Sequence, residues 1–146
     1  YVSANDQNFD LFETFPDFHR QIAGKQHYGT AFWNTLWSFI TQGTAELSLA
    51  YHEQNQLVGC IYVADAGKTT YYSMGVFNRN LFNFPLSHFP VFDAMVRASS
   101  RGMKIFDLGE IPVKNDGIND KEVQIGFFKR GFASNFNRFT LWELEL

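Results

Sequence analysis

The sequence predicts an α+β fold with a mixed central sheet flanked by helices. Two observations support this class. Apolar residues recur every three or four positions up to about residue 42 and then alternate, so the hydrophobic period changes from that of helices to that of strands. Beyond residue 86, helical and strand-like segments follow one another, which adds later strands to an antiparallel meander.

Two helices are expected at the N-terminal end. Residues 5–24 carry apolar side chains at helical spacing, with an interruption or restart at Pro16, where Asp17 can cap the restarted helix. Residues 30–42 repeat the helical pattern, and Thr30 is the expected N-cap. Both helices present an aromatic stripe, which predicts that they pack against a common core.

Three strands follow at residues 46–52, 57–64 and 69–77, separated by short polar turns. The segments alternate in polarity or are rich in β-branched and aromatic residues, as strands are. Gly59 lies inside the second strand, where a glycine marks a β-bulge or a close approach by another group. The short turns predict an antiparallel meander.

The remaining elements alternate between helix and strand. They are a helix at 87–101, a strand at 104–108, a polar loop at 112–121, a short helix at 122–130 and a strand at 136–144. Ser87 is the expected N-cap of the first helix, and Pro90 is tolerated in its first turn. No repeat or linker interrupts residues 1–146, which are expected to form one domain.

Composition excludes several classes of protein. Hydrophobic residues make up 45% and charged residues 18%, a balance that supports a packed core. The formal net charge of −3 argues against nucleic-acid binding through overall positive charge. Only a local basic patch could provide such binding. The single cysteine, Cys60, excludes an internal disulfide, and no apolar run is long enough for a membrane span. A soluble, cytoplasmic protein is expected.

Two motifs in the last third of the chain suggest chemistry. In F-D-L-G-E, residues 106–110, a buried strand is expected to end at a glycine that is followed by Glu110. Glu110 can be a general base, an anchor for an amine, or an ordinary solvated carboxylate. In F-F-K-R-G-F, residues 127–132, Lys129 and Arg130 stand between aromatics. They can balance the helix dipole, or one can stabilise an oxyanion or bind an anionic group.

Three further residues are candidates, each with an ordinary structural role as the alternative. His88 at a helix start can carry a proton or serve only in capping and packing. Arg79 follows a strand and can hold an anionic group, although such arginines are more often solvated. Lys25 belongs to a basic cluster at the end of the first helix that can bind phosphates of a substrate.

Other site types find no support in the sequence. The four histidines include no pair at helical i, i+4 spacing, so no metal site is predicted. The G-x-S-x-G elbow of serine hydrolases is absent, and no P-loop or dinucleotide-binding fingerprint occurs.

Five segments, in their order and spacing, resemble the Fem-type (FemAB-like) acyltransferases of the GNAT superfamily, specifically their C-terminal GNAT-like half. The segments are His19–Lys25, Tyr71–Gly75, Pro85–His88, Phe106–Glu110 and Phe127–Phe132. The resemblance implies a GNAT-like fold and places Lys129 at the transfer centre, with Glu110 or His88 assisting deprotonation of the acceptor. It also makes Tyr72, Arg79, Arg130 and Lys25 candidate substrate-binding residues.

The segment after the third meander strand bears on the identity of the donor. Acetyl-CoA enzymes of the superfamily usually cradle the pyrophosphate with a glycine-bearing loop after the third meander strand, but no glycine occurs here between Gly75 and Gly102. This departure predicts weak binding of free acetyl-CoA. It agrees with the Fem type, whose classical members take aminoacyl-tRNA and have two GNAT-like halves. Either an N-terminal half precedes these residues or the chain is a shorter relative.

The resulting hypothesis is an N-acyltransferase or aminoacyltransferase that moves an activated acyl group to an amine on a cell-envelope precursor or amino sugar. No tightly bound cofactor is expected, and the donor is aminoacyl-tRNA or acyl-CoA. One alternative is an acyl-CoA-dependent N-acetyltransferase that acts on small molecules. The other is a GNAT-like domain without catalytic activity that binds a partner or ligand.

Overall fold

The computed structural model describes residues 2–4, 8–24, 28–52, 55–81, 86–111 and 119–137. The chain falls into two compact units, Tyr1–Gly109 and Glu110–Leu146. Among the described residues, the first unit contains the sheet and the α-helices α1, α2 and α3, and the second contains α4.

Two helices open the first unit, α1 at Phe9–Ala23 and α2 at Thr30–Thr41. The predicted restart at Pro16 is wrong, because α1 runs through it without interruption. Proline removes one backbone hydrogen bond, but the buried rings of Phe12, Phe15 and Phe18 hold the helix against the core on both sides of it. Asp17 is therefore not a cap.

The caps of these helices also differ from the prediction. Asp17 lies within α1 and forms an ion pair with Arg20 one turn later. The N-cap of α2 is Gly29 in an extended conformation, one residue before the expected Thr30. Neither helix has a side-chain hydrogen bond at its N-cap, so burial of their apolar faces is what stabilises them.

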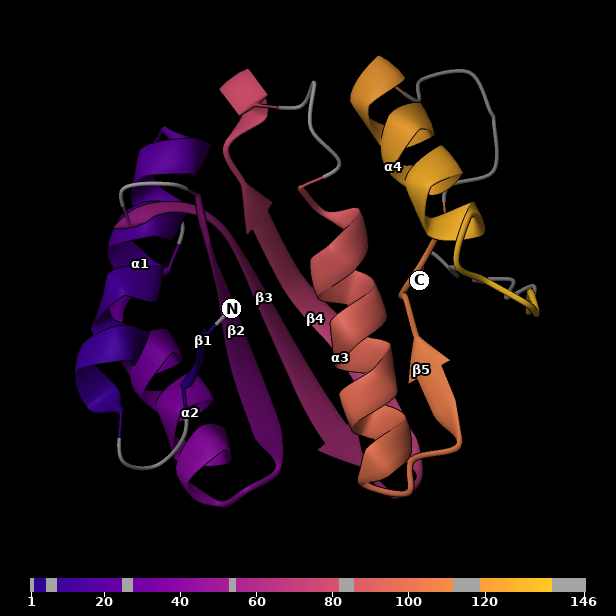
Figure 1. The fold of residues 1–146 in the computed structure, drawn as a ribbon, viewed down its shortest axis with the longest axis horizontal. Helices are drawn as coiled ribbons and strands as arrows, with labels where there is room; N and C mark the ends of the chain where they lie inside the picture. Colours follow the sequence, from indigo (N-terminus) through magenta and orange to yellow (C-terminus); the bar gives the residue numbers. More distant parts are fainter. Residues whose placement is uncertain are drawn as a thin grey trace, which may run out of the picture. The chain divides into compact units, whose positions relative to one another are not determined.

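A five-stranded sheet forms the centre of the first unit, with its strands in chain order (Figure 1). The strands are β1 at Val2–Ala4, β2 at Ala45–His52, β3 at Gln56–Ala66, β4 at Thr69–Phe77 and β5 at Ile105–Asp107. The antiparallel meander of β2, β3 and β4 confirms the prediction. β5 pairs with β4 in parallel, which makes the sheet mixed. β1 was not predicted, and β5 is shorter than expected.

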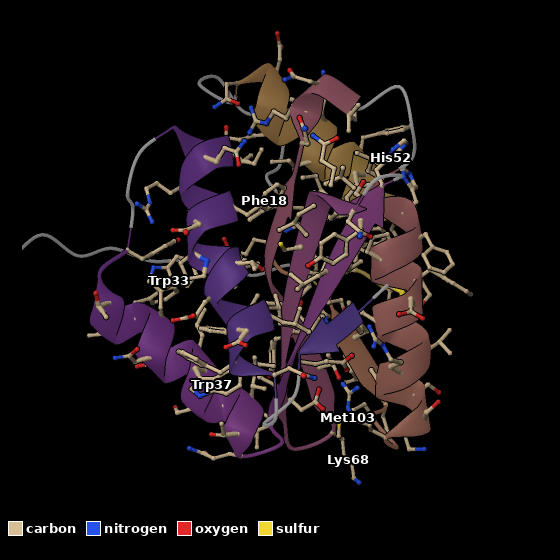
Figure 2. All side chains as sticks on the ribbon, turned by 60° about the vertical axis from the view of Figure 1, so that its left-hand side comes forward. Phe18, Trp33, Trp37, His52, Lys68 and Met103 are labelled. Carbon is tan, nitrogen blue, oxygen red and sulfur yellow. The ribbon has the colours of Figure 1, made fainter. Side chains whose placement is uncertain are left out.

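The main core lies between the sheet and the pair α1–α2. Phe12, Phe15 and Phe18 pack with side chains that alternate along the strands, such as Leu47, Cys60, Tyr62 and Val76. Figure 2 shows Phe18 on the side of α1 that meets the sheet. The Tyr62 hydroxyl donates a hydrogen bond of 2.9 Å to the main-chain oxygen of Leu36, which fixes α2 to β3.

Helix α3, at His88–Ser100, covers the opposite face of the sheet. Leu47 and Leu49 belong to the core beneath α1 and α2, so Ser48 between them points the other way. There it accepts a hydrogen bond from Arg97 of α3. Ser87 is the N-cap residue, as predicted, but its side chain makes no capping hydrogen bond.

The second unit contains α4 at Asp120–Arg130. A reciprocal capping box starts it: the Asn119 side chain accepts from the Glu122 N–H at 3.0 Å, and the Glu122 carboxylate accepts from the Asn119 N–H at 3.1 Å. The helix thus begins two residues before its expected start. Of the strand predicted at 136–144, residues 138–144 lie outside the described residues, and Phe136 and Asn137 have no regular structure.

The described residues contain neither a membrane-spanning helix nor a cluster of metal-ligating side chains. Among them, no helix has the length and apolar character needed to cross a bilayer. In the same ranges, no three or more His, Cys, Asp or Glu side chains cluster as metal ligands would.

Candidate functional site

The irregular part of the sheet is β4. Its register against β3 shifts between Tyr62, which pairs with Met74, and Val63, which pairs with Tyr72. Ser73 is therefore an extra residue, a β-bulge that bends the strand and increases its twist. Bulges of this kind often lie beside functional sites, which makes the bulged part of β4 a candidate site.

On its other edge β4 is paired over a short stretch only. β5 meets it at Thr69, Thr70 and Tyr71, and β5 ends at Asp107. Within the described ranges, no strand continues this pairing along β4 from Tyr72 to Phe77. Among the residues that the structure describes, the peptide N–H and C=O groups along that edge have no strand partner, and groups of this kind can pair with another extended chain.

Two glycines make room for aromatic rings beside the bulge. A Cβ on Gly75 would lie 1.8 Å from the Tyr72 hydroxyl oxygen and 3.2 Å from Phe77, and a Cβ on Gly59 would lie 2.6 Å from Phe77. The two rings therefore lie directly over the two glycines. The prediction for Gly59 is confirmed twice, because a register shift between Ala50 and Tyr51 also accompanies it.

Tyr72 is the predicted site residue that lies closest to the bulge. Burial raises the pKa of its hydroxyl to about 12. The group therefore stays protonated at neutral pH, where it can donate a hydrogen bond but cannot act as a base. The same signal that marked Gly59, a glycine inside a strand, is present at Gly75 and predicts this close approach.

Arg79 and His88 flank the end of β4. Arg79 begins a 3₁₀ turn, Arg79–Leu81, directly after the strand, and His88 is the first residue of α3. Figure 1 shows β4 ending and α3 beginning at the same end of the first unit. Both side chains are exposed, and the positive end of the α3 helix dipole points toward this end.

A tight turn follows β5. The Asp107 carboxylate accepts a hydrogen bond of 2.7 Å from the Gly109 N–H, and Gly109 has a φ of 74° that suits glycine. The motif F-D-L-G-E is thus a strand followed by a turn, as the sequence predicts.

In the second unit, Lys129 approaches the segment of Glu110. Its Nζ donates a hydrogen bond of 2.9 Å to the main-chain oxygen of Glu110, and the exposed Glu110 side chain is not the acceptor. The structure therefore brings these two predicted residues together, with a main-chain contact in place of paired side chains. Their roles in catalysis stay predictions.

The aromatics around Lys129 are only partly buried. Phe128 and Phe132 pack edge to face with centroids 5.3 Å apart, but Phe127 is 81% exposed. Arg130, the last residue of α4, is exposed. Lys25 lies outside the described residues.

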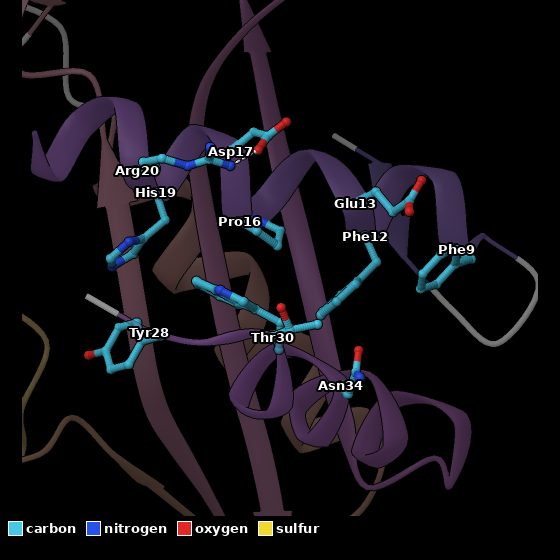
Figure 3. Close-up of a pocket in the computed structure, with 11 residues that line it drawn as sticks. Phe9, Phe12, Glu13, Pro16, Asp17, His19, Arg20, Tyr28, Thr30 and Asn34 are labelled. Carbon is cyan, nitrogen blue, oxygen red and sulfur yellow. Dashed lines mark hydrogen bonds and ion pairs between the residues drawn. The ribbon is translucent and has the colours of Figure 1, made fainter. Parts of the chain in front are cut away.

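Sequence reasoning missed a groove between α1 and α2, in the first unit, with a volume of about 420 Å³ (Figure 3). Phe9, Phe12 and Trp33 contribute to its walls. The aromatic residues of these helices were assigned to the core because core and groove residues share the same helical spacing. The carboxylates interspersed among them, Glu13 and Asp17, were the available signal.

No protein family and no curated protein sequence matches this chain. Solved structures do match its fold. The chain superposes on the aminoglycoside acetyltransferase meta-AAC0020, from an uncultured soil metagenomic sample and in complex with sisomicin, with a TM-score of 0.71 at 10% identity, covering 99% of this chain and 94% of that one.

Two other neighbours are similar at the same level. The aminoglycoside 6'-N-acetyltransferase AAC(6')-Ih from Acinetobacter baumannii gives a TM-score of 0.68 at 8% identity, covering 99% and 97% of the two chains. AAC(6')-Iy, in complex with the bisubstrate analogue CoA-S-monomethyl-acetylneamine, gives 0.65 at 9% identity, covering 99% and 97%. The fold of this chain is therefore that of the GNAT acetyltransferases.

Proposed function

We propose that the chain is an acyl-CoA-dependent N-acetyltransferase that acts on a small-molecule amine. The observation that carries the proposal is the bulged β4 strand, whose edge from Tyr72 to Phe77 has no strand partner among the described residues, in a fold shared with acetyltransferases. Among the hypotheses drawn from the sequence, this alternative agrees better with the structural neighbours than aminoacyl transfer does. One of those neighbours was solved with a CoA bisubstrate analogue.

The donor would bind along β4. The pantetheine arm of CoA carries two amides, which can pair with peptide groups from Tyr72 to Phe77 as an added strand would. Arg79 and the N-terminus of α3, beyond the end of the strand, would attract the phosphates. Tyr72 would then be a neutral hydrogen-bond donor at the bulge.

The chemistry is attack of an unprotonated amine on the thioester carbonyl. The C–N bond forms, the C–S bond breaks, the thiolate leaves, and the amine proton passes to a base. Glu110 or His88 is the predicted base, and the Lys129 cation is predicted to stabilise the oxyanion. The hydrogen bond from Lys129 to the Glu110 carbonyl supports this role by orienting the ammonium group.

A second candidate is the Fem-type reaction, with aminoacyl-tRNA as donor and a cell-envelope precursor as acceptor. One observation favours it: the segment after β4 contains no glycine before Gly102, so it lacks the usual pyrophosphate loop. The two candidates therefore differ most clearly in their affinity for CoA.

Titration calorimetry with acetyl-CoA separates them. We expect a dissociation constant in the low micromolar range, about −8 kcal/mol. Arg79→Ala should weaken binding, whereas Arg20→Ala, which removes an exposed arginine of α1, should not. If acetyl-CoA does not bind at millimolar concentration, the acetyltransferase assignment fails and the Fem-type candidate takes its place.

A further inference from the structure

The groove between α1 and α2 has the size of a small-molecule site. Its volume of about 420 Å³ lies within the range of ligand pockets. It lies between the two helices that cover one face of the sheet, and α3 covers the opposite face. Figure 3 shows α1 and α2 as its two walls, with Phe9 and Tyr28 at its opposite ends.

The groove presents aromatic faces that are fixed in orientation. Phe9 is 45% and Tyr28 37% exposed, and each is backed by another ring, Trp37 at 5.0 Å and Phe32 at 4.1 Å between centroids. Between them, Trp33 packs edge to face on the buried Phe15 at 5.2 Å. Because each of these rings already contacts another ring, a ligand would have less side-chain ordering to impose.

The polar rim of the groove carries more negative than positive charge. From α1 it is lined by two carboxylates, one guanidinium and one imidazole: Glu13, Asp17, Arg20 and His19. Arg20 is already paired with Asp17. Within the described part of the chain, Glu13 has no ion-pair partner, and its charge therefore remains to be balanced.

From these observations we infer that the groove binds an organic cation, namely a protonated amine carried on a ring-sized apolar body. The faces of aromatic rings attract cations through their quadrupoles, and Glu13 supplies a full negative charge beside them. Asn34 and Thr30, which line the groove from α2, offer neutral hydrogen-bond partners for the rest of the ligand. This binding requires no acyl transfer and goes beyond the proposed function.

Other occupants fit the groove less well. An anion would have to displace Asp17 from Arg20 and would lie beside Glu13 and the negative faces of the rings. A purely apolar ligand would offer Glu13 no ion-pair partner, whereas Asp17 already pairs with Arg20. The combination of aromatic faces with uncompensated negative charge selects a cation.

The test uses three ligands of similar size that differ in charge: 2-phenylethylammonium, 2-phenylethanol and 3-phenylpropionate. Each is titrated into the isotope-labelled chain, and the indole N–H resonance of Trp33 is followed by NMR. We expect the ammonium ion to bind about ten times more tightly than the alcohol and to shift the Trp33 resonance. Equal affinities, or tighter binding of the carboxylate, would overturn the proposal.

A matched pair of variants locates the site. Glu13→Gln removes the charge at the groove, and Asp10→Asn removes a charge from the same helix outside the lining. Glu13→Gln should weaken ammonium binding about threefold or more and leave alcohol binding unchanged, whereas Asp10→Asn should change neither. If both variants weaken binding equally, the attraction is a general surface effect and the groove is not the site.

The contribution of the aromatic rings that line the groove can be tested separately from that of the Glu13 charge. Tyr28→Leu removes one exposed ring and should weaken ammonium binding, while the melting temperature reports whether the fold is retained. Acetyl-CoA affinity, measured on Glu13→Gln, should equal that of the wild type. Unchanged ammonium binding in Tyr28→Leu would contradict an aromatic contribution at this end.

Discussion

At the scale of single residues, Lys129 is the most informative position. Its Nζ is held by the Glu110 carbonyl, so the ammonium group has a defined place in the second unit. Lys129→Met keeps most of the stem volume and removes the charge. We expect turnover to fall by about a hundredfold, the scale of losing one oxyanion donor, with the melting temperature little changed. Steady-state kinetics beside thermal melts measure both.

Lys68, an exposed lysine in the turn between β3 and β4, supplies the control for Lys129. It has no predicted role in the site, and Lys68→Met should leave turnover nearly unchanged. Lys129→Arg should restore only part of the rate, because a planar guanidinium delivers its charge differently. If Lys129→Met is stable and fully active, the residue has no role in transfer.

A second residue-scale prediction concerns Tyr72 and alkaline pH. The folded protein holds the Tyr72 proton up to about pH 12, whereas an unfolded tyrosine loses it near its ordinary value of 10.0. Unfolding therefore releases a proton between these values, and stability falls as pH rises through this window. The free energy of unfolding should lose up to about 3 kcal/mol from this group.

Comparison with Tyr72→Phe isolates the contribution of Tyr72, since burial also raises the pKa of Tyr62 and Cys60. Urea titrations of both proteins from pH 9 to 12 give the measurement. The wild type should lose more stability than the variant across this range. Parallel curves would mean that Tyr72 titrates normally in the folded state.

At the scale of elements, the bulge in β4 depends on Gly75. An alanine Cβ there would lie 1.8 Å from the Tyr72 hydroxyl, so the ring has to move. Gly75→Ala should cost about 1–3 kcal/mol of stability, as overpacking does. Adding Tyr72→Phe removes the closest atom and should recover part of the loss. Thermal melts of the two single variants and the double variant check this; strictly additive losses would contradict the contact.

Helix α3 is attached to the sheet by charged groups. Arg97 and Arg101 both reach Glu46, at 2.6 and 2.7 Å, and Arg101 also pairs with Asp65 at 2.9 Å. Burial disfavours the charged form of Arg101, but its hydrogen bonds and the charges of Asp65 and Glu46 outweigh this and raise its pKa. The network fixes α3 over β2 and β3.

Glu46→Ala should therefore be clearly destabilising. The variant removes the Glu46 carboxylate from the partly buried guanidinium groups of Arg97 and Arg101, so less negative charge remains beside them. The free energy of unfolding, measured in urea, should fall by about 1–3 kcal/mol. Arg20→Ala removes the exposed pair with Asp17 on α1 and should cost at most about 1 kcal/mol. If both variants lose the same small amount, the network does not anchor α3.

The sequence predicts the elements well where one hydrophobic period dominates. The meander was predictable because alternation and short turns leave few other arrangements, whereas β1 has only three residues and shows no period. The break at Pro16 was predicted wrongly because the local cost of proline is visible in sequence and the burial of three phenylalanines on α1 is not.

The site was less predictable than the fold. The order of the motifs placed Glu110 and Lys129 in one region, but sequence cannot show whether a lysine meets a carboxylate or a main-chain carbonyl. The open edge of β4 was also hidden, because it depends on how far β5 extends along the sheet. Such features arise from pairing between distant segments and not from local patterns.

At the scale of the whole molecule, we propose that the chain transfers an acetyl group from CoA to an amine. The direct measurement is release of free CoA thiol from acetyl-CoA, followed with a thiol reagent, in the presence and absence of a panel of small amines that includes amino sugars. We expect thiol release that depends on both the amine and Lys129. No amine-dependent release, under conditions where the folded protein is saturated with acetyl-CoA, would contradict it.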